Sequence, residues 1–238
     1  MRTAGIDLSS QPVGTAACLV DWRDGIARVE SVENLVDDGR LKTLLADTTI
    51  NQVGIDVPLG WPDGFVRALQ LHRDGQEWPQ LPTKDLTHRA TDRWLIDHLR
   101  VYPLSVSTDR IAYPAMRAAV LTAGMARDGS GRLVEVYPAA ALNVWRLQYQ
   151  RYKRSTGRAV LSDIIAALRQ RAPWLVANET SWRSFHTSDD AFDAFVAALI
   201  ARAHAPGLCH AIPDSDRKAA IREGWICVPN GMVDALID

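Results

Sequence analysis

Alternating apolar and polar positions along the chain predict five β-strands. In residues 3–9, the apolar side chains of Ala4, Ile6 and Leu8 share one face, and Asp7 lies on the other. This two-residue period is typical of a strand. The same analysis predicts strands over residues 3–9, 14–21, 26–33, 51–57 and 132–137.

The segments between these strands indicate how they are connected. The Asp24-Gly25 turn between the second and third strands favours a hairpin, so the early part of the sheet should be antiparallel. Helical crossovers between the later strands favour parallel pairing there. The expected helices are residues 37–45, 64–74, 87–100, 112–126, 139–153, 159–170 and 188–204.

Residues 60–130 are the least regular part of the chain, and we interpret them as a helical insertion packed on the sheet. No internal repeat or low-complexity linker divides the sequence. A short strand-like piece, Gly224 to Val228, lies in the tail. The pattern therefore predicts a single α/β domain over residues 1–238, with a mixed five-stranded sheet, helices on both faces and a helical insertion after strand four.

Composition and charge narrow the function classes only a little. The chain has 27 Lys and Arg against 28 Asp and Glu, a formal charge of -1, so overall charge does not indicate nucleic-acid binding, although a local basic patch would allow it. The longest apolar run, Ala194 to Ala201, is too short to span a bilayer. Cysteines 18, 209 and 227 are odd in number and lack zinc-ligand spacing. We expect a cytoplasmic protein with reduced thiols and no membrane segment.

Two predicted strands contain the same small motif. One is Gly5-Ile6-Asp7 and the other is Gly54-Ile55-Asp56, each with large apolar neighbours. An aspartate in such a strand costs several kcal/mol unless it is paired or bound to a metal ion. The alternative is a strand-end aspartate that caps a turn, and this alternative is stronger for Asp56, which precedes Pro58.

The predicted helix 188–204 contains the sharper candidates. Asp189 and Asp190 have an ordinary explanation, because carboxylates are favourable at the positive end of a helix dipole. Asp193 lies beyond the first turn and is the only polar side chain from 191 to 201. Asp190 and Asp193 are three residues apart and share a face, where two carboxylates repel unless a cation or a proton lies between them.

These carboxylates are hard oxygen ligands suited to Mg²⁺ or Mn²⁺. We predict Asp7, Asp56, Asp190 and Asp193 as catalytic residues, and Asp7, Asp56, Asp193 and Glu135 as metal ligands. Two such ions about 4 Å apart support in-line attack on a phosphodiester. Glu135 has an equal alternative, an ion pair with Arg89 or Arg93.

Arginine side chains supply the candidate phosphate contacts. Arg89 and Arg93 can position a phosphate, and the alternative is a structural salt-bridge network with Asp92. In residues 145–158, five basic residues alternate with Trp145, Tyr149 and Tyr152. That mixture suits a nucleic-acid backbone and its bases, but a solvated helix face with aromatic anchors is the favoured interpretation.

The order of the acidic residues resembles the RuvC-like branch of the RNase H superfamily: Asp7 in strand one, Asp56 in strand four and Asp190-Ala-Phe-Asp193 in the last helix. More closely, the chain resembles a domain-of-unknown-function family of predicted nucleases with an RNase H-like fold. The segments that match are Gly5-Ile6-Asp7, Ile55-Asp56-Val57-Pro58-Leu59-Gly60-Trp61-Pro62, Arg89-Ala-Thr91-Asp92-Arg93, Glu135-Val-Tyr137-Pro138, Asp190-Ala-Phe-Asp193-Ala and Glu223-Gly224-Trp225-Ile226.

This resemblance implies a metal-dependent nuclease that acts on nucleic acid, with a homodimer as an option because RuvC-like resolvases act as dimers. Two departures matter. Asp56 stands where the resolvases have a longer Glu, and the insertion at 60–130 has no counterpart in the small resolvases. The insertion can cover the site and restrict it to a small substrate.

Two other function classes stay open at this stage. An actin-like phosphotransferase also begins with an aspartate in strand one, but it needs glycine-rich phosphate loops, and Ser9-Ser10 is a poor substitute. A non-catalytic binding protein with the same fold would have its acidic residues neutralised by arginine partners. The spatial arrangement of the aspartates decides among these classes.

Overall fold

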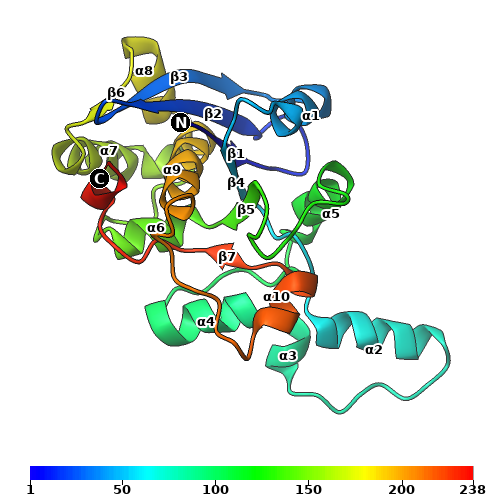
Figure 1. Cartoon of the computed structure of the whole chain (residues 1–238). Coiled ribbons are helices and arrows are strands. Elements are labelled where there is room, and N and C mark those ends of the chain that lie inside the picture. The colour runs from blue at the N-terminus through cyan, green and yellow to red at the C-terminus, as the bar shows by residue number, and fades with distance from the viewer. Residues whose placement is uncertain (238) are drawn as a thin grey trace.

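The computed structural model describes residues 1–237 and contains one mixed seven-stranded sheet, in the order β6-β3-β2-β1-β4-β5-β7 (Figure 1). The five predicted strands form its centre. Two-residue strands at the two edges make seven rather than the expected five. One of them, at Ile226–Cys227, lies inside the strand-like piece noted at 224–228, and the other, at Leu175–Val176, is too short to show a periodicity. The strands are β1 (Arg2–Asp7), β2 (Ala16–Arg23), β3 (Ile26–Asn34), β4 (Gln52–Asp56), β5 (Leu133–Val136), β6 (Leu175–Val176) and β7 (Ile226–Cys227).

The strand directions follow the connections in the sequence. β1, β2 and β3 are antiparallel neighbours, and the hairpin turns at Asp24 and Gly25, which both have positive φ. β4 is parallel to β1 and to β5, and the edge strands β6 and β7 also pair in parallel. The mixed sheet expected from the sequence is therefore confirmed.

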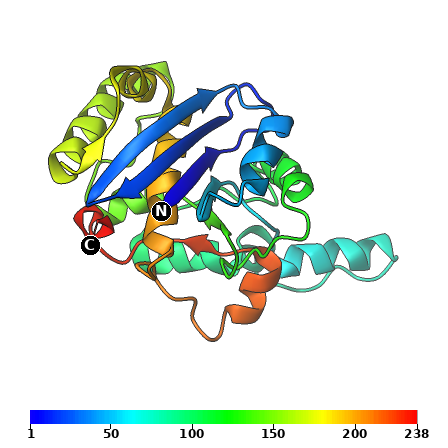
Figure 2. The same ribbon diagram turned by 45° about the horizontal axis from the view of Figure 1, so that its top comes forward.

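Helices cover both faces of the sheet (Figures 1 and 2). α6, α7, α8 and α9 bury apolar side chains against one face, and α1 and α5 do so against the other. Along the chain, helices α2 to α5 come between β4 and β5. α2 extends away from the sheet in both views. The helices are α1 (Asp38–Ala46), α2 (Asp63–Arg73), α3 (Thr83–Thr87), α4 (Ala90–Leu99), α5 (Ala112–Leu121), α6 (Pro138–Val144), α7 (Arg158–Arg171), α8 (Glu179–Thr187), α9 (Asp189–His204) and α10 (Arg217–Glu223), with 3₁₀ turns at Ser155–Gly157 and Val233–Leu236.

α9 crosses the sheet at two adjacent glycines. Gly5 of β1 and Gly54 of β4 are register partners. A Cβ at Gly5 would lie 1.9 Å from the Ala194 carbonyl oxygen, and a Cβ at Gly54 would lie 2.4 Å from that of Ala197. Only glycine permits this approach of helix backbone to strand backbone. The glycine of each Gly-Ile-Asp motif thus seats α9, and the aspartate two residues later emerges on the same face of the sheet.

The predicted helix 139–153 is wrong in its second half. α6 ends at Val144, and the chain continues as a loop in which Arg146, Arg151 and Arg154 all have positive φ. Trp145 is fully buried, and Tyr152 is only 2% exposed. The aromatic side chains at 145, 149 and 152 imitate a helical period, but a loop buries 145 and 152 in the core instead. No glycine marks the end of the helix, so the sequence contains no clear stop signal.

None of the helices within residues 1–237 combines the length and the apolar character needed to cross a lipid bilayer.

Candidate active site at the strand ends

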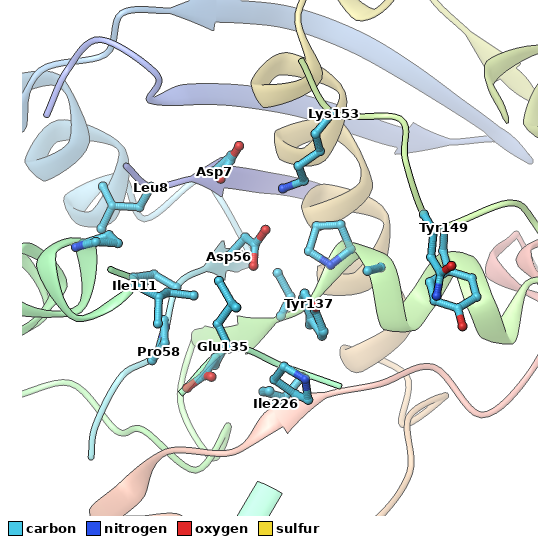
Figure 3. Close-up of a pocket in the computed structure, with 18 of the residues that line it drawn as sticks. Asp7, Leu8, Asp56, Pro58, Ile111, Glu135, Tyr137, Tyr149, Lys153 and Ile226 are labelled. Atoms are coloured by element: carbon cyan, nitrogen blue, oxygen red, sulfur yellow. The ribbon is translucent and has the colours of Figure 1, made fainter. Parts of the chain in front are cut away.

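Asp7 and Asp56 end two neighbouring strands side by side. β1 and β4 are parallel and pair Asp7 with Asp56 in register. Both side chains leave the sheet on the face that α9 covers, because each lies two residues after the glycine that α9 contacts. Figure 3 shows the two carboxylates facing a common space that the Lys153 side chain enters from the other side. The sequence prediction that these two residues meet agrees with this arrangement.

The surroundings of both carboxyl groups disfavour their charged forms. Burial raises the pKa of Asp56 to about 7; the Lys153 ammonium opposes this, and the Asp193 and Glu135 carboxylates add to it. Burial also raises the pKa of Asp7 well above its usual value, against the same lysine and together with the neighbouring aspartates. Within residues 1–237, neither carboxylate forms an ion pair or a side-chain hydrogen bond. These two groups therefore lack a compensating partner of their own.

Asp193 reaches the same place from the first turns of α9 and is fully buried. Its Oδ1 accepts a hydrogen bond of 2.7 Å from the Tyr152 hydroxyl. Its Oδ2 forms an ion pair with the Lys153 Nζ at 2.6 Å. The cation that the sequence requires beside Asp193 is, in this structure, a lysine.

Asp190 lies at the edge of this cluster. Ser188 caps α9 by accepting a hydrogen bond from the Ala191 N–H, so the helix start is satisfied without Asp190. Burial, then the neighbouring Asp189, raises the pKa of Asp190 to about 6. Its half-buried carboxylate is close enough to influence Asp7 electrostatically, but it does not line the cavity described below. It is a peripheral member of the acidic cluster.

Lys153 is the functional candidate that the sequence analysis missed. We expected it on a helix, whereas it projects from the loop after α6 into the acidic cluster. Burial alone would lower its pKa, but Asp193 and the other acidic neighbours raise it well above the usual value. One signal was available: only four of the 27 basic residues are lysines. A lysine kept in an arginine-rich chain suggests a position that needs a compact ammonium group.

Glu135 points away from the aspartates. It pairs in register with Ile55, and Leu133, which lies on its side of β5, packs in the α1 and α5 core. Side chains alternate along a strand, so Glu135 and Asp56 leave opposite faces of the sheet. Figure 3 shows the Glu135 carboxylate turned away from Asp7 and Asp56. This arrangement matches the ion-pair alternative for Glu135 rather than the metal-ligand prediction.

Arg89 holds Glu135 in a buried network. Its guanidinium contacts both Glu135 oxygens, Nη1 at 2.8 Å and Nη2 at 2.7 Å. It also donates to Asp92 from Nε at 3.1 Å and from Nη2 at 2.9 Å. All three side chains are at most 2% exposed. With its donors committed to carboxylates, Arg89 has the structural role that was the alternative to phosphate binding.

The tail of the chain closes the same network. Glu223, at the end of α10, accepts hydrogen bonds from the backbone N–H groups of Ala90 and Asp63, each at 2.7 Å. Gly224 follows with φ of 84°, and a Cβ there would lie 2.8 Å from Glu135. The Arg89, Glu135 and Glu223 motifs thus join the insertion, the sheet and the tail into one buried node.

Arg93 also lies apart from the acidic cluster. Its guanidinium donates to the His88 carbonyl oxygen at 2.7 Å and lies 3.5 Å from Asp85. It is absent from the lining of the cavity in front of Asp7 and Asp56. Arg89 and Glu135 line this cavity together with Asp7 and Asp56, but the Arg89 guanidinium is already bonded to Glu135 and Asp92, and Arg93 lies outside the lining.

A cavity of about 470 Å³ opens in front of Asp7 and Asp56. Lys153 is among the residues that line it, and 54% of the Lys153 side-chain surface stays accessible. The walls are mostly apolar or aromatic and come from the insertion, from the start of α6 and from the loop that contains Lys153. They include Pro103, Leu104, Ile111, Pro114, Tyr137, Pro138 and Tyr149.

The carboxylate oxygens of the cluster suit a divalent cation, but Lys153 already occupies the place beside Asp193. Asp7 and Asp56 supply hard oxygen atoms with no partner of their own, which is what Mg²⁺ and Mn²⁺ prefer. In the part of the chain from residue 1 to 237, no three His, Cys, Asp or Glu side chains already stand as a metal-binding group. The residues fit a metal ion that Asp7 and Asp56 hold in common, beside an Asp193 that Lys153 already neutralises.

The raised carboxyl pKa values predict how stability depends on pH in the metal-free protein. Between pH 8 and 6, Asp56 takes up a proton in the folded state, with a pKa of about 7, but not in the unfolded state. Stability should therefore rise as the pH falls, by about 1 kcal/mol from this residue. Asp7 and Asp190 act in the same direction, and His204 and His210, whose pKa values burial lowers, oppose it.

The measurement is the unfolding free energy in EDTA at both pH values, for the natural chain and for Asp56→Asn. Subtracting the variant removes the histidine contributions. A difference of the opposite sign would mean that Asp56 is charged and stabilised at pH 6.

Comparison with known proteins adds one finding. Residues 5–218 match the model of a family described as "Protein of unknown function (DUF429)". Neither the curated proteins nor the solved structures contain a match to the chain.

Proposed function

Since the chain belongs to the DUF429 family, whose description states no activity, we propose from the site that it is a metal-dependent hydrolase of phosphodiester bonds in nucleic acids or their fragments. One observation carries the proposal. Asp7 and Asp56 lie in register at the ends of adjacent parallel strands, without a partner, and face a cavity. Half-buried, unpaired carboxylates at a cleft are groups that a divalent ion stabilises.

The same proposal includes an RNase H-like fold. The support is the placement of the acidic residues on the mixed sheet: Asp7 on the central strand β1, Asp56 on its parallel neighbour β4, and Asp193 on the helix that crosses both. This is the arrangement that the resemblance implied. A nuclease assignment by fold alone would be an analogy, and the residues of the site are what support the function.

Asp7 and Asp56 would hold the ion, and Asp193 would lie beside it. When bound, a divalent ion activates water and stabilises charge on the phosphate oxygens. In the hydrolysis, a water oxygen bonds to phosphorus, the bridging P–O bond breaks, and the departing oxygen takes a proton. Tyr152 holds Asp193 in one orientation through its hydroxyl, and the cavity walls in front of the strand aspartates are mostly apolar.

The cavity sets the size of the group that can react. A volume of about 470 Å³ is at the small end for ligand sites and takes one nucleotide-sized group, with Tyr137 and Tyr149 positioned to contact a sugar or a base. The proline-rich wall at 103 and 114 comes from the segment between β4 and β5. We therefore propose a single-stranded end or a short fragment as substrate rather than an intact duplex.

No specific observation favours the two other classes. A non-catalytic binder with neutralised aspartates would need arginine partners at Asp7 and Asp56, and the ion pairs within residues 1–237 include none. The Ser9-Ser10 loop after β1 uses its Ser9 hydroxyl on the Val13 carbonyl oxygen, which is an internal turn contact.

Addition of Mn²⁺ to the metal-free protein should raise its melting temperature. At an ion concentration about 100 times the dissociation constant, binding adds about 2.7 kcal/mol, or about 5–10 °C for a chain of this size. Asp56→Asn should lose most of this shift, whereas Asp163→Asn, an exposed residue on α7, should keep it. The parallel assay is hydrolysis of a dinucleotide and of duplex DNA, with Mn²⁺ and with EDTA. The proposal would be rejected if Mn²⁺ left the melting temperature unchanged and no metal-dependent cleavage were found.

A further inference from the structure

Lys153 is held in the acidic cluster by its neighbours on both sides. Tyr152, immediately before it, is buried and donates to Asp193 at 2.7 Å. Arg154, immediately after it, donates its backbone N–H to the Asp189 carboxylate at 3.2 Å. The lysine is therefore fastened at two points to the first turn and a half of α9. These two contacts restrict the position of the loop that contains the ammonium group.

The backbone of this loop adopts conformations that are unfavourable for its residues. Arg151 and Arg154 have φ of 61° and 67°, in the left-handed region, and neither is glycine. Each such residue costs about 1 kcal/mol or more, so the surrounding structure must enforce it. Gly157 closes the loop, since a Cβ there would lie 2.4 Å from the Tyr152 backbone carbon. The strain is concentrated around the residue that enters the cluster.

The charges in the cluster show what the ammonium replaces. Asp7, Asp56 and Asp193 are three acidic groups. The Lys153 side chain enters the space that Asp7 and Asp56 face (Figure 3), and its ammonium lies against Asp193. Its Nζ forms an ion pair with Asp193 Oδ2 at 2.6 Å. One acidic group is thus matched, and two are left for one divalent ion.

Accepting the proposed function, we infer that Lys153 is a built-in substitute for the second metal ion: the site takes one divalent ion at Asp7 and Asp56, and the ammonium at Asp193 supplies the other positive charge facing the phosphate. This differs from the two-ion arrangement expected from the sequence. A lysine at this place also explains why one wall of the cavity is a strained loop rather than the continuation of α6.

The test is the number of Mn²⁺ ions bound per chain, measured by isothermal calorimetry on the natural protein and on Lys153→Ala. We expect one ion in the natural protein and two in the variant, because the vacated position between Asp193 and the strand aspartates then accepts a cation. Lys153→Arg keeps the charge and should bind one ion. Lys42→Ala, an exposed lysine on α1, is the matched control and should also bind one.

A second readout uses kinetics. Below saturation, the cleavage rate of Lys153→Ala should depend on the second power of the Mn²⁺ concentration, against the first power in the natural protein. If Lys153→Ala does not fold, Lys153→Gln offers a neutral side chain of similar length for the same titration.

The outcomes separate this inference from the proposed function. Two ions in the natural protein, or one ion in both the natural protein and Lys153→Ala, would overturn the inference and leave a metal-dependent hydrolase. If the natural protein bound no Mn²⁺, both the inference about Lys153 and the proposed function would be overturned, whether or not Lys153→Ala bound the ion.

Discussion

Asp7→Asn is expected to abolish Mn²⁺-dependent cleavage, by about a thousandfold or more, while the protein stays folded. The loss corresponds to about 4 kcal/mol of transition-state stabilisation. Asp7 ends the central strand β1, beside Asp56 and facing Lys153, so no other carboxylate on that strand can replace it. Asparagine keeps the shape and one carbonyl oxygen but removes the negative charge that holds a cation.

The stability of Asp7→Asn should move in the opposite direction from its activity. Burial raises the pKa of Asp7 well above its usual value, so the charged form disfavours folding above the unfolded-state pKa. Without metal at pH 8, the neutral asparagine should give a melting temperature equal to or higher than that of the natural protein. Asp97→Asn, an exposed position on α4, should change neither quantity. Full activity in Asp7→Asn would exclude this residue from catalysis.

Arg89→Ala is expected to be among the most destabilising single substitutions in the chain, by about 3–5 kcal/mol. It leaves the carboxylates of Glu135 and Asp92 buried without their cation. Those two residues belong to β5 and α4, so the contact between the insertion and the sheet weakens at the same time. Urea unfolding gives the free energy directly.

Arg93→Ala is the matched control, because it also removes an arginine side chain, at a position four residues further along the chain. Arg93 is about one-third exposed and lies 3.5 Å from its carboxylate partner Asp85. A loss below about 1 kcal/mol is expected for such a pair. If Arg89→Ala were stable and instead raised the KM for substrate, the phosphate-binding role expected from the sequence would be right and the structural role wrong.

Residue patterns were sufficient for the strands and for the aspartates. A period of two over β1 to β4 is a local property, and so is the isolation of Asp193 in an apolar helix. The Gly-Ile-Asp motif is also local, and its two residues have separate uses: the glycine admits α9 and the aspartate reaches its face. Physical constraints that act within a few residues can be detected in the sequence.

Pairings between distant side chains could not be derived in this way. Glu135 and Arg89 are 46 residues apart, and either could have faced the aspartates until the register of β5 fixed which side of the sheet Glu135 occupies. The edge strand β6 has only two residues, too few for a pattern, and it is a strand because β3 offers it hydrogen bonds. A local sequence pattern cannot reveal a pairing partner that lies far away in the sequence.

By itself, the sequence determined a mixed α/β sheet and placed two aspartates at its strand ends, since burial and side-chain alternation follow from neighbouring residues. Only the tertiary structure decided that Lys153 enters the cluster, because burial of Trp145 and Tyr152 overrides a pattern that predicts a helix. The physical reason is the same for both outcomes. An isolated carboxylate in an apolar strand demands a counter-charge, but which cation meets that demand depends on how the whole chain packs.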